Sequence, residues 1–162
     1  MKSTKEIFDS WVGEWKISRR LGEYGTIEGV AKFSHDVGEQ VLYREDLLLT
    51  YFSIISKPVY REYTYFYNNG EIEKKFHDQT NLNQKFYALI FDDLHLTATG
   101  KYICNQDAYL AYYNFFSKNQ FSLSYKVEGP NKQYIITSSY IRVDQEEYAN
   151  GLVKILGVVD LD

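Results

Sequence analysis

The sequence predicts an all-β fold, a closed up-and-down antiparallel β-barrel of about 8–10 strands with a short N-terminal helix. Apolar and polar residues alternate with period two along most of the chain, as expected when one face of each strand is buried and the other is in water. Short turn sequences separate these stretches, which leaves no room for the long crossovers that parallel strands need. The 16 tyrosines and 10 phenylalanines, set against two prolines, also favour strands.

Ten segments fit this alternation. They are Glu14–Leu21, Thr26–Ser34, Gln40–Thr50, Val59–Asn68, Glu71–His77, Lys85–Phe91, His95–Cys104, Tyr109–Ser117, Phe121–Glu128 and Gln133–Val143. Between them, Asn69-Gly70 supplies the positive φ that a tight hairpin needs, and Pro130 presets φ at a turn. Because the links are short, sequential strands should be spatial neighbours, and closure of the sheet would remove its exposed edges.

Helical character is predicted only before the first strand. Ser3 or Thr4 is expected to cap a short helical turn, with Glu6 nearby, and this turn would plug one end of the barrel. After Arg142 the chain becomes acidic and then apolar, a pattern that leaves an extra strand, a capping helix and a dimer contact open. At 162 residues we expect one domain, 1–162, with a core of about 8–143 and a C-terminal extension at 144–162.

Charge and cysteine content narrow the classes of partner. The net charge of −4 and the pI near 5.4 argue against nucleic acid and anionic membranes, which are normally bound by basic surfaces. The chain has no apolar run of signal-peptide or membrane-spanning length. A single cysteine, Cys104, excludes an intrachain disulfide and fits a reducing compartment, so we expect a cytoplasmic location and interpret the thiol as a buried small hydrophobe.

The two ends of the predicted sheet carry a pair of residues suited to closing a barrel. Gly13 and Trp15 open the first strand, and Arg142 ends the last one. An arginine late in the chain can lie flat on an early tryptophan if the first and last strands pair, a contact worth roughly 0.5 to 2 kcal/mol. We therefore assign Gly13, Trp15 and Arg142 to structural closure.

These closure residues also resemble the signature of lipocalins, in the calycin superfamily. Three further strings strengthen the resemblance: Tyr60-Arg61-Glu62-Tyr63-Thr64-Tyr65, Cys104-x-x-Asp107-x-Tyr109, and Val127-x-Gly129-Pro130-x-Lys132-x-Tyr134 followed by Tyr140-x-Arg142. Together they are similar to a family of lipocalin-like domains of unknown function, from about Phe8 to Arg142. Where that family has a histidine two positions before the cysteine, this chain has Tyr102. The resemblance implies a fold and a set of positions, without a substrate.

Alternation places charged and tyrosine side chains on the same strand faces as apolar ones, so some are expected inside the barrel. The candidate ligand-binding residues are Arg19, Tyr43, Glu45, Arg61, Tyr63, Asp107, Tyr109, Tyr125, Tyr134 and Tyr140. An unpaired charge in the interior costs several kcal/mol, so these residues should either pair with one another or meet a ligand.

Two interpretations of these charges remain open. In the first, Glu45 pairs with Arg61, and Asp107 pairs with Arg19 or Lys132. In the second, the arginines and tyrosine hydroxyls converge on a carboxylate or phosphate, because a guanidinium matches such groups with two parallel hydrogen bonds.

Sequence motifs for cofactors and metals are not found. The three histidines, His35, His77 and His95, lack metal-ligand spacing, and we expect no metal and no cofactor.

The favoured hypothesis is therefore binding of a small, partly apolar molecule with a polar or anionic head inside the barrel. The first alternative is a cofactor-independent enzyme of the isomerase, cyclase or lyase type, in which Glu45 or Asp107 would have a raised pKa and act beside tyrosines as the catalytic group. The second is a structural or interaction module whose barrel is filled by side chains. The expected partner is a small molecule, and the sequence also leaves room for a homodimer.

Overall fold

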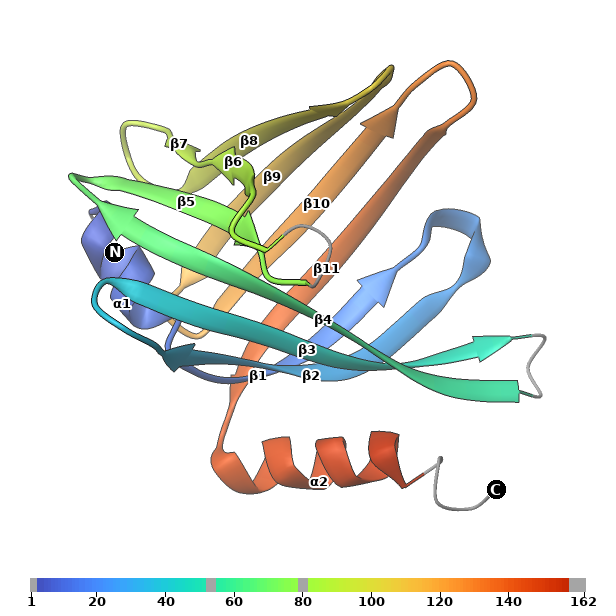
Figure 1. Cartoon of the computed structure of the whole chain (residues 1–162). Coiled ribbons are helices and arrows are strands. Elements are labelled where there is room, and N and C mark those ends of the chain that lie inside the picture. The colour runs from blue at the N-terminus through green and yellow to red at the C-terminus, as the bar shows by residue number, and fades with distance from the viewer. Residues whose placement is uncertain (1–2, 52–54, 79–81, 158–162) are drawn as a thin grey trace.

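The structure, a computed structural model, describes residues 3–51, 55–78 and 82–157 and shows one antiparallel β-barrel (Figure 1). Its strands are β1 Gly13–Arg20, β2 Thr26–His35, β3 Gln40–Tyr51, β4 Ile55–Asn68, β5 Glu71–Phe76, β6 Lys85–Ala88, β7 Ile90–Phe91, β8 Thr97–Cys104, β9 Asp107–Ser117, β10 Gln120–Glu128 and β11 Gln133–Val143. Two α-helices, α1 Thr4–Ser10 and α2 Gln145–Leu156, and a short 3-10 turn at Gly22–Tyr24 complete the described elements. The predicted all-β barrel is confirmed.

Ring closure occurs in two places. The first and last strands, β1 and β11, pair in antiparallel fashion with Trp15 opposite Arg142. On the other side of the barrel, β6 pairs with β5, and β7 pairs with β8. The two short strands β6 and β7 are consecutive parts of one segment of the chain. Between them, the Leu89 backbone N–H donates to the Ile72 carbonyl at 2.9 Å. A single stretch of chain therefore joins the two ends of the sheet, where the sequence predicted one continuous strand.

Arg142 holds the closed end of the barrel together. Its guanidinium lies 4.3 Å from the centre of the Trp15 ring and donates to the backbone carbonyls of Ser10, Val12 and Lys118. The predicted closure contact is thus confirmed, and Arg142 also ties the turn between β9 and β10 to the end of α1 and the residues that follow it.

Replacing Arg142 with lysine should lower the free energy of unfolding by about 1 to 2 kcal/mol, because an ammonium cannot make the same set of hydrogen bonds while lying flat on an indole. Urea denaturation measures the loss. Arg20→Lys, at the exposed end of β1, is the matched control and should change stability by less than about 0.5 kcal/mol. Equal effects of the two substitutions would contradict the role given to Arg142.

Helix α1 plugs this end as predicted. The Ser3 hydroxyl caps it by accepting from the Glu6 backbone N–H at 3.1 Å. Ile7, Phe8 and Trp11 are almost completely buried and belong to the core. The core near α1 is therefore filled by packed aromatic side chains.

Helix α2 lies outside the barrel, along β1–β3 (Figure 1). The Asp144 carboxylate caps it by accepting from the Glu147 backbone N–H at 2.8 Å. Its buried Ile155 faces the sheet, and Gly151 approaches Val30 so closely that a Cβ at this position would lie 2.7 Å from a Val30 methyl. Of the three structures left open for the tail, residues 145–156 form a helix, while residues 158–162 lie outside the described part of the chain.

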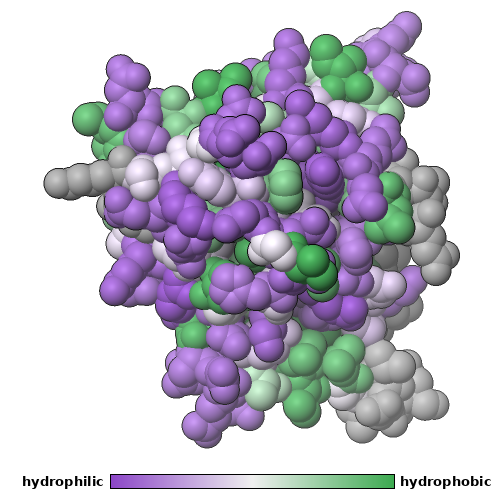
Figure 2. Space-filling model, turned by 60° about the vertical axis from the view of Figure 1, so that its left-hand side comes forward, coloured by the Kyte–Doolittle hydropathy of each residue, from purple (hydrophilic) through white to green (hydrophobic). Residues whose placement is uncertain are grey.

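The outer surface is mixed in character. One face is mainly hydrophilic, with apolar residues in separate small groups (Figure 2). Cys104 is exposed at the end of β8, so its interpretation as a buried hydrophobe is wrong; it belongs to a hairpin tip, where neither sheet face is covered. In the described ranges, no helix is long and apolar enough to cross a membrane.

Candidate functional site

The barrel interior holds a buried ion pair between Arg19 on β1 and Glu45 on β3. The two side chains form two parallel hydrogen bonds, Nη1 to Oε2 at 2.6 Å and Nη2 to Oε1 at 2.8 Å. Arg19 Nε also donates to the Ser138 hydroxyl at 2.7 Å. The Tyr43 hydroxyl donates to Glu45 Oε1 at 2.6 Å and lies 2.8 Å from the Tyr140 hydroxyl. Together these five residues form the Arg19–Glu45 network.

Strand parity explains this convergence. Arg19 follows the buried Trp15 and Ile17 on the inner face of β1, while Tyr43 and Glu45 share the inner face of β3. Sequence reasoning identified four of the network's members and omitted the serine, which is short and has no distinctive spacing.

The predicted pairing of Glu45 with Arg61 is wrong. Arg61 is the direct neighbour of Glu45 in the β3–β4 register, yet Glu45 binds the more distant Arg19. The physical reason is burial: Arg61 is exposed, whereas Arg19 is largely enclosed and has to find a partner for its charge. Of the two predicted partners of Asp107, Arg19 is wrong because it binds Glu45, and Lys132 is confirmed, at 3.3 Å from Asp107.

The expected rise in the pKa of Glu45 is also wrong. Burial by itself would raise that pKa, but the hydrogen bonds and charge of Arg19 outweigh burial and hold it below its ordinary value. The same hydrogen bonds and charge raise the pKa of Arg19, although burial acts to lower it. The pair is therefore ionised, and Glu45 is poorly suited to remove a proton from a substrate.

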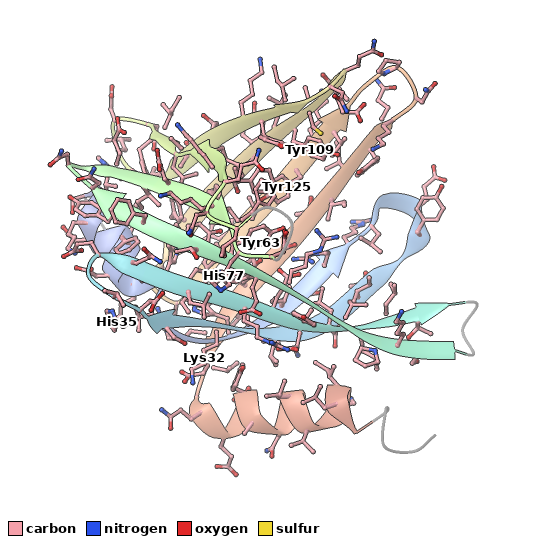
Figure 3. All side chains as sticks on the ribbon, viewed as in Figure 1. Lys32, His35, Tyr63, His77, Tyr109 and Tyr125 are labelled. Atoms are coloured by element: carbon pink, nitrogen blue, oxygen red, sulfur yellow. The ribbon has the colours of Figure 1, made fainter. Side chains whose placement is uncertain are left out.

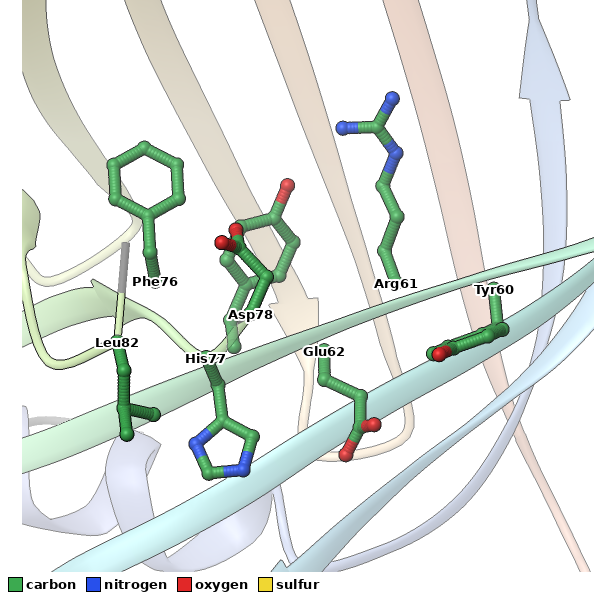
Figure 4. Close-up of a pocket in the computed structure, with 8 residues that line it drawn as sticks. Tyr60, Arg61, Glu62, Phe76, His77, Asp78 and Leu82 are labelled. Atoms are coloured by element: carbon green, nitrogen blue, oxygen red, sulfur yellow. The ribbon is translucent and has the colours of Figure 1, made fainter. Parts of the chain in front are cut away.

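A pocket of about 610 Å³, called here the mouth pocket, lies where β4 extends beyond β5. Its lining residues are Tyr60, Arg61, Glu62, Tyr63, Phe76, His77, Asp78 and Leu82. The described part of β5 pairs with β4 only from Tyr63 onward, which leaves the first half of β4 without a β5 neighbour. Arg61 and Phe76 project to one side of β4, and Glu62 and His77 to the other (Figure 4). The volume is within the range of small-molecule sites.

Arg61 is the cation of the mouth pocket. Its charge interacts chiefly with the Tyr63 hydroxyl, which raises the pKa of the guanidinium. Burial raises the pKa of Tyr63, so this hydroxyl keeps its proton at neutral pH. No ion pair joins Arg61 to a carboxylate in the described ranges, whereas Glu62 lies 3.6 Å from Arg44 on the outer face of the sheet.

Behind the pocket lies a buried lysine, Lys74 on β5, which is 2% exposed. Its ammonium donates to the Tyr125 hydroxyl at 2.9 Å. Five aromatic rings surround it at 4.1 to 5.6 Å, namely those of Tyr63, Tyr65, Phe86, Tyr87 and Tyr125. Burial lowers the pKa of Lys74 to about 7, because the distant charge of Glu45 offsets only part of the lost hydration. We refer to the five rings as the Lys74 cage.

The cage continues into a chain of tyrosine hydroxyls. Tyr125 lies 2.6 Å from the Tyr87 hydroxyl, Tyr87 lies 2.6 Å from Tyr113, and Tyr113 lies 3.1 Å from Tyr65. Burial raises the pKa of each of these phenols, so the chain is neutral and its protons can be shared along it.

The remaining candidate residues lie elsewhere. Asp107 lines a second pocket of about 330 Å³ at two hairpin tips, together with Asn105, Gln106, Pro130, Asn131 and Lys132. Tyr134 is 42% exposed at the start of β11, and Tyr109 lies against Tyr102, with ring centres 6.1 Å apart.

Tyr63 and Tyr125 point into the barrel (Figure 3). The structure thus gathers Arg19, Tyr43, Glu45 and Tyr140 in one network and places Arg61 and Tyr63 in the mouth pocket.

Sequence reasoning missed Lys74 and most of the pocket lining. The string Glu71-Ile72-Glu73-Lys74-Lys75 has the composition of a charged surface strand. Strand parity could have revealed the burial of Lys74, because Lys74 lies on the same face of the strand as Ile72, which is completely buried, and Phe76. Among the described residues, no group of three or more histidine, cysteine or acidic side chains could hold a metal ion.

Comparisons with solved structures find barrels of similar fold at low sequence identity. An S-type phycobiliprotein lyase CPES from Guillardia theta superposes with a TM-score of 0.62 at 9% identity, over 88% of this chain and 94% of the lyase. A protein of unknown function of the DUF3598 family from Nostoc punctiforme gives 0.54 at 9% identity, over 84% of this chain and 49% of that protein. A redesigned beta barrel gives 0.50 at 8% identity, over 85% of this chain and 96% of the design. No curated protein matches the sequence.

The family assignment comes from the sequence itself. A family of unknown function (DUF6314) matches residues 11–142, which run from the buried Trp11 after α1 to the closure residue Arg142. This range agrees with the range, from about Phe8 to Arg142, over which the sequence resembles a family of unknown function, and the solved structures share the barrel fold. The chain belongs to the DUF6314 family of unknown function.

Proposed function

We propose that the protein binds one small, partly apolar molecule with an anionic head in the mouth pocket. The head would lie on the Arg61 guanidinium, and the apolar part would lie against Tyr63, Phe76 and Leu82. The single observation that carries this proposal is an arginine in a pocket of about 610 Å³ without a carboxylate paired to it in the described ranges.

The charge of the interior supports an anion. Arg19 and Glu45 neutralise each other, so Arg61 and Lys74 are left as the other basic side chains that the described strands direct inward, and burial favours the uncharged form of Lys74. Glu62 is turned to the side of β4 opposite to Arg61 (Figure 4), where it lies 3.6 Å from Arg44. Asp78, which also lines the pocket, is exposed. An anionic head would therefore meet a guanidinium that forms no ion pair with a carboxylate of the described ranges.

Packing limits where the ligand can lie. The core between α1 and the Arg19–Glu45 network is filled by aromatic rings such as Trp11, Phe33 and Phe121. We therefore assign the binding site to the mouth and not to a hollow running the length of the barrel. We also propose a cytoplasmic location, which the single free cysteine favours; the homodimer stays a prediction.

A matched pair of fluorescent probes tests the proposed function. 1-Anilinonaphthalene-8-sulfonate and N-phenyl-1-naphthylamine share their rings, and only the first carries an anionic group. Arg61→Gln should weaken binding of the sulfonate by at least about tenfold, the loss expected for one charge-assisted hydrogen bond, and should leave the neutral probe within about twofold. Fluorescence titration at constant salt measures both affinities.

Arg20→Gln is the control for net charge, because it removes an exposed guanidinium from the end of β1. It should leave both affinities unchanged. If Arg61→Gln and Arg20→Gln have the same effect on the sulfonate, the anion is attracted by overall charge and the assignment to Arg61 is wrong.

A further inference from the structure

Lys74 has a setting that surface lysines lack. It is almost completely buried, it donates to a neutral phenol, and in the described part of the chain it forms no salt bridge with a carboxylate. An ammonium held in this way loses hydration without gaining a counter-ion, which favours the uncharged amine. An uncharged amine is a nucleophile, whereas an ammonium is not.

The cage separates this amine from the mouth pocket by a single layer of side chains. On β5, Phe76 lines the pocket and Lys74 is the next residue directed inward. On β4, Tyr63 belongs to both sites, because it lines the pocket and its ring centre lies 4.1 Å from the Lys74 nitrogen. Phe86 stacks on Phe76, with ring centres 4.5 Å apart, and borders the same nitrogen. Access of a bound molecule to the amine therefore requires movement of the rings of the Lys74 cage, such as a rotamer change.

We propose that Lys74 forms a reversible Schiff base with an aldehyde or ketone group of a molecule held in the mouth pocket. This inference rests on the proposed function, since the pocket has to hold the apolar part of the molecule first. It adds a covalent site and a chemical class of ligand, a carbonyl compound, to non-covalent binding.

The chemistry balances with the groups present. The Lys74 nitrogen lone pair attacks the carbonyl carbon, a C–N bond forms, and the carbonyl π electrons become an alkoxide, which takes up one of the two protons of the nitrogen. The resulting carbinolamine then loses its hydroxyl together with the second nitrogen proton as water as the C=N bond forms, and addition of water reverses the sequence. Tyr125, which is hydrogen-bonded to the nitrogen and to Tyr87, is positioned to pass the proton through the tyrosine chain. No oxidant, reductant or metal is required.

The lowered pKa supports the reaction at neutral pH. With a pKa of about 7, roughly half of Lys74 is uncharged at pH 7. Its neighbour Lys75 lies on the opposite face of β5, over the Phe66 ring, and serves as the internal reference. The groups that act on the charge of Lys74 are Glu45, Arg19 and Arg61, together with the neutral phenols of the cage.

Reductive trapping of the unaltered chain tests the proposal. The protein is incubated at pH 7 with 2-naphthaldehyde and sodium cyanoborohydride, which reduces an imine to a stable secondary amine, and the modified peptides are mapped by mass spectrometry. Lys74 should be modified at least about tenfold more than Lys75, and this preference should shrink at pH 9, where the neutral fraction of Lys75 rises. Equal modification of the two lysines, or none at Lys74, would overturn the proposal.

Two variants separate failure of the Schiff base from failure of the proposed function. Lys74→Met should abolish trapping at this position and leave N-phenyl-1-naphthylamine affinity within about twofold, while Lys75→Met should change neither. If trapping at Lys74 fails but the neutral probe still binds and Arg61→Gln still weakens the sulfonate, only the Schiff base is wrong. If neither probe binds, the mouth pocket is not a ligand site and both proposals are wrong.

Discussion

Replacing Glu45 with glutamine is expected to lower the free energy of unfolding by about 3 to 5 kcal/mol. The substitution keeps the shape of the side chain and removes its charge, so the enclosed Arg19 guanidinium loses its counter-ion. Arg19 cannot shed its proton to escape this cost, because the pKa of a guanidinium lies far above neutral pH. Urea denaturation at pH 7 measures the change.

A matched control isolates burial as the cause. Glu128 pairs with Lys126 at 2.9 Å on the barrel surface, and Glu128→Gln should cost less than about 1 kcal/mol because water screens that pair. Combining Arg19→Met with Glu45→Gln should recover much of the loss, since no unpaired charge remains. A loss for Glu45→Gln as small as that for Glu128→Gln would show that the Arg19–Glu45 network is solvated.

Replacing Lys74 with methionine is expected to raise the free energy of unfolding at pH 7 by about 2 to 4 kcal/mol. The folded chain gives up the Lys74 proton near pH 7, whereas the ordinary pKa of the side chain is 10.5. Between these values the unfolded state binds more protons than the folded state, so the stability of the unaltered protein should rise with pH. This difference in proton binding should raise the free energy of unfolding of the unaltered protein by about 2 kcal/mol between pH 7 and pH 9.

This rise in the free energy of unfolding with pH can be assigned to Lys74, because it should be absent in Lys74→Met. The stability advantage of Lys74→Met over the unaltered protein should shrink by about 2 kcal/mol from pH 7 to pH 9, as the buried amine loses its proton. Lys75→Met, on the outer face of β5, should show no such trend. A constant difference between the two proteins over this pH range would mean that Lys74 stays charged inside the barrel.

The fold was predictable because period-two alternation and turn chemistry act locally. All ten predicted strands are present within a few residues, and Asn69 and Gly70 adopt the positive φ expected of a tight hairpin. The segment around Leu89 differs, because a continuous apolar run does not show that its two halves pair with different neighbours. The sequence left the secondary structure of the C-terminal tail open for a related reason. Helix α2 packs against Val30 on β2, which is distant in sequence.

The candidate site was predictable in part, since parity gives the face of a residue and not its partner. Parity placed Arg19, Glu45 and Arg61 inside, but the choice of Arg19 as the partner of Glu45 depends on how far each guanidinium is enclosed. Lys74 was missed because lysine is ordinarily a surface residue, and its burial follows from aromatic rings contributed by three different strands, β4, β6 and β10. Such a cage exists only once the strands are assembled.

Backbone amide spectra during titration with 1-anilinonaphthalene-8-sulfonate locate the bound anion and so test whether the mouth pocket is the binding site. Saturable shifts are expected at residues 60–63, 76–78 and 82, with the largest shifts around Arg61, and these shifts should be lost in Arg61→Gln. Shifts concentrated on the outer faces of the strands or at the Asp107 hairpin tips, with none around Arg61, would contradict the assignment to the mouth pocket.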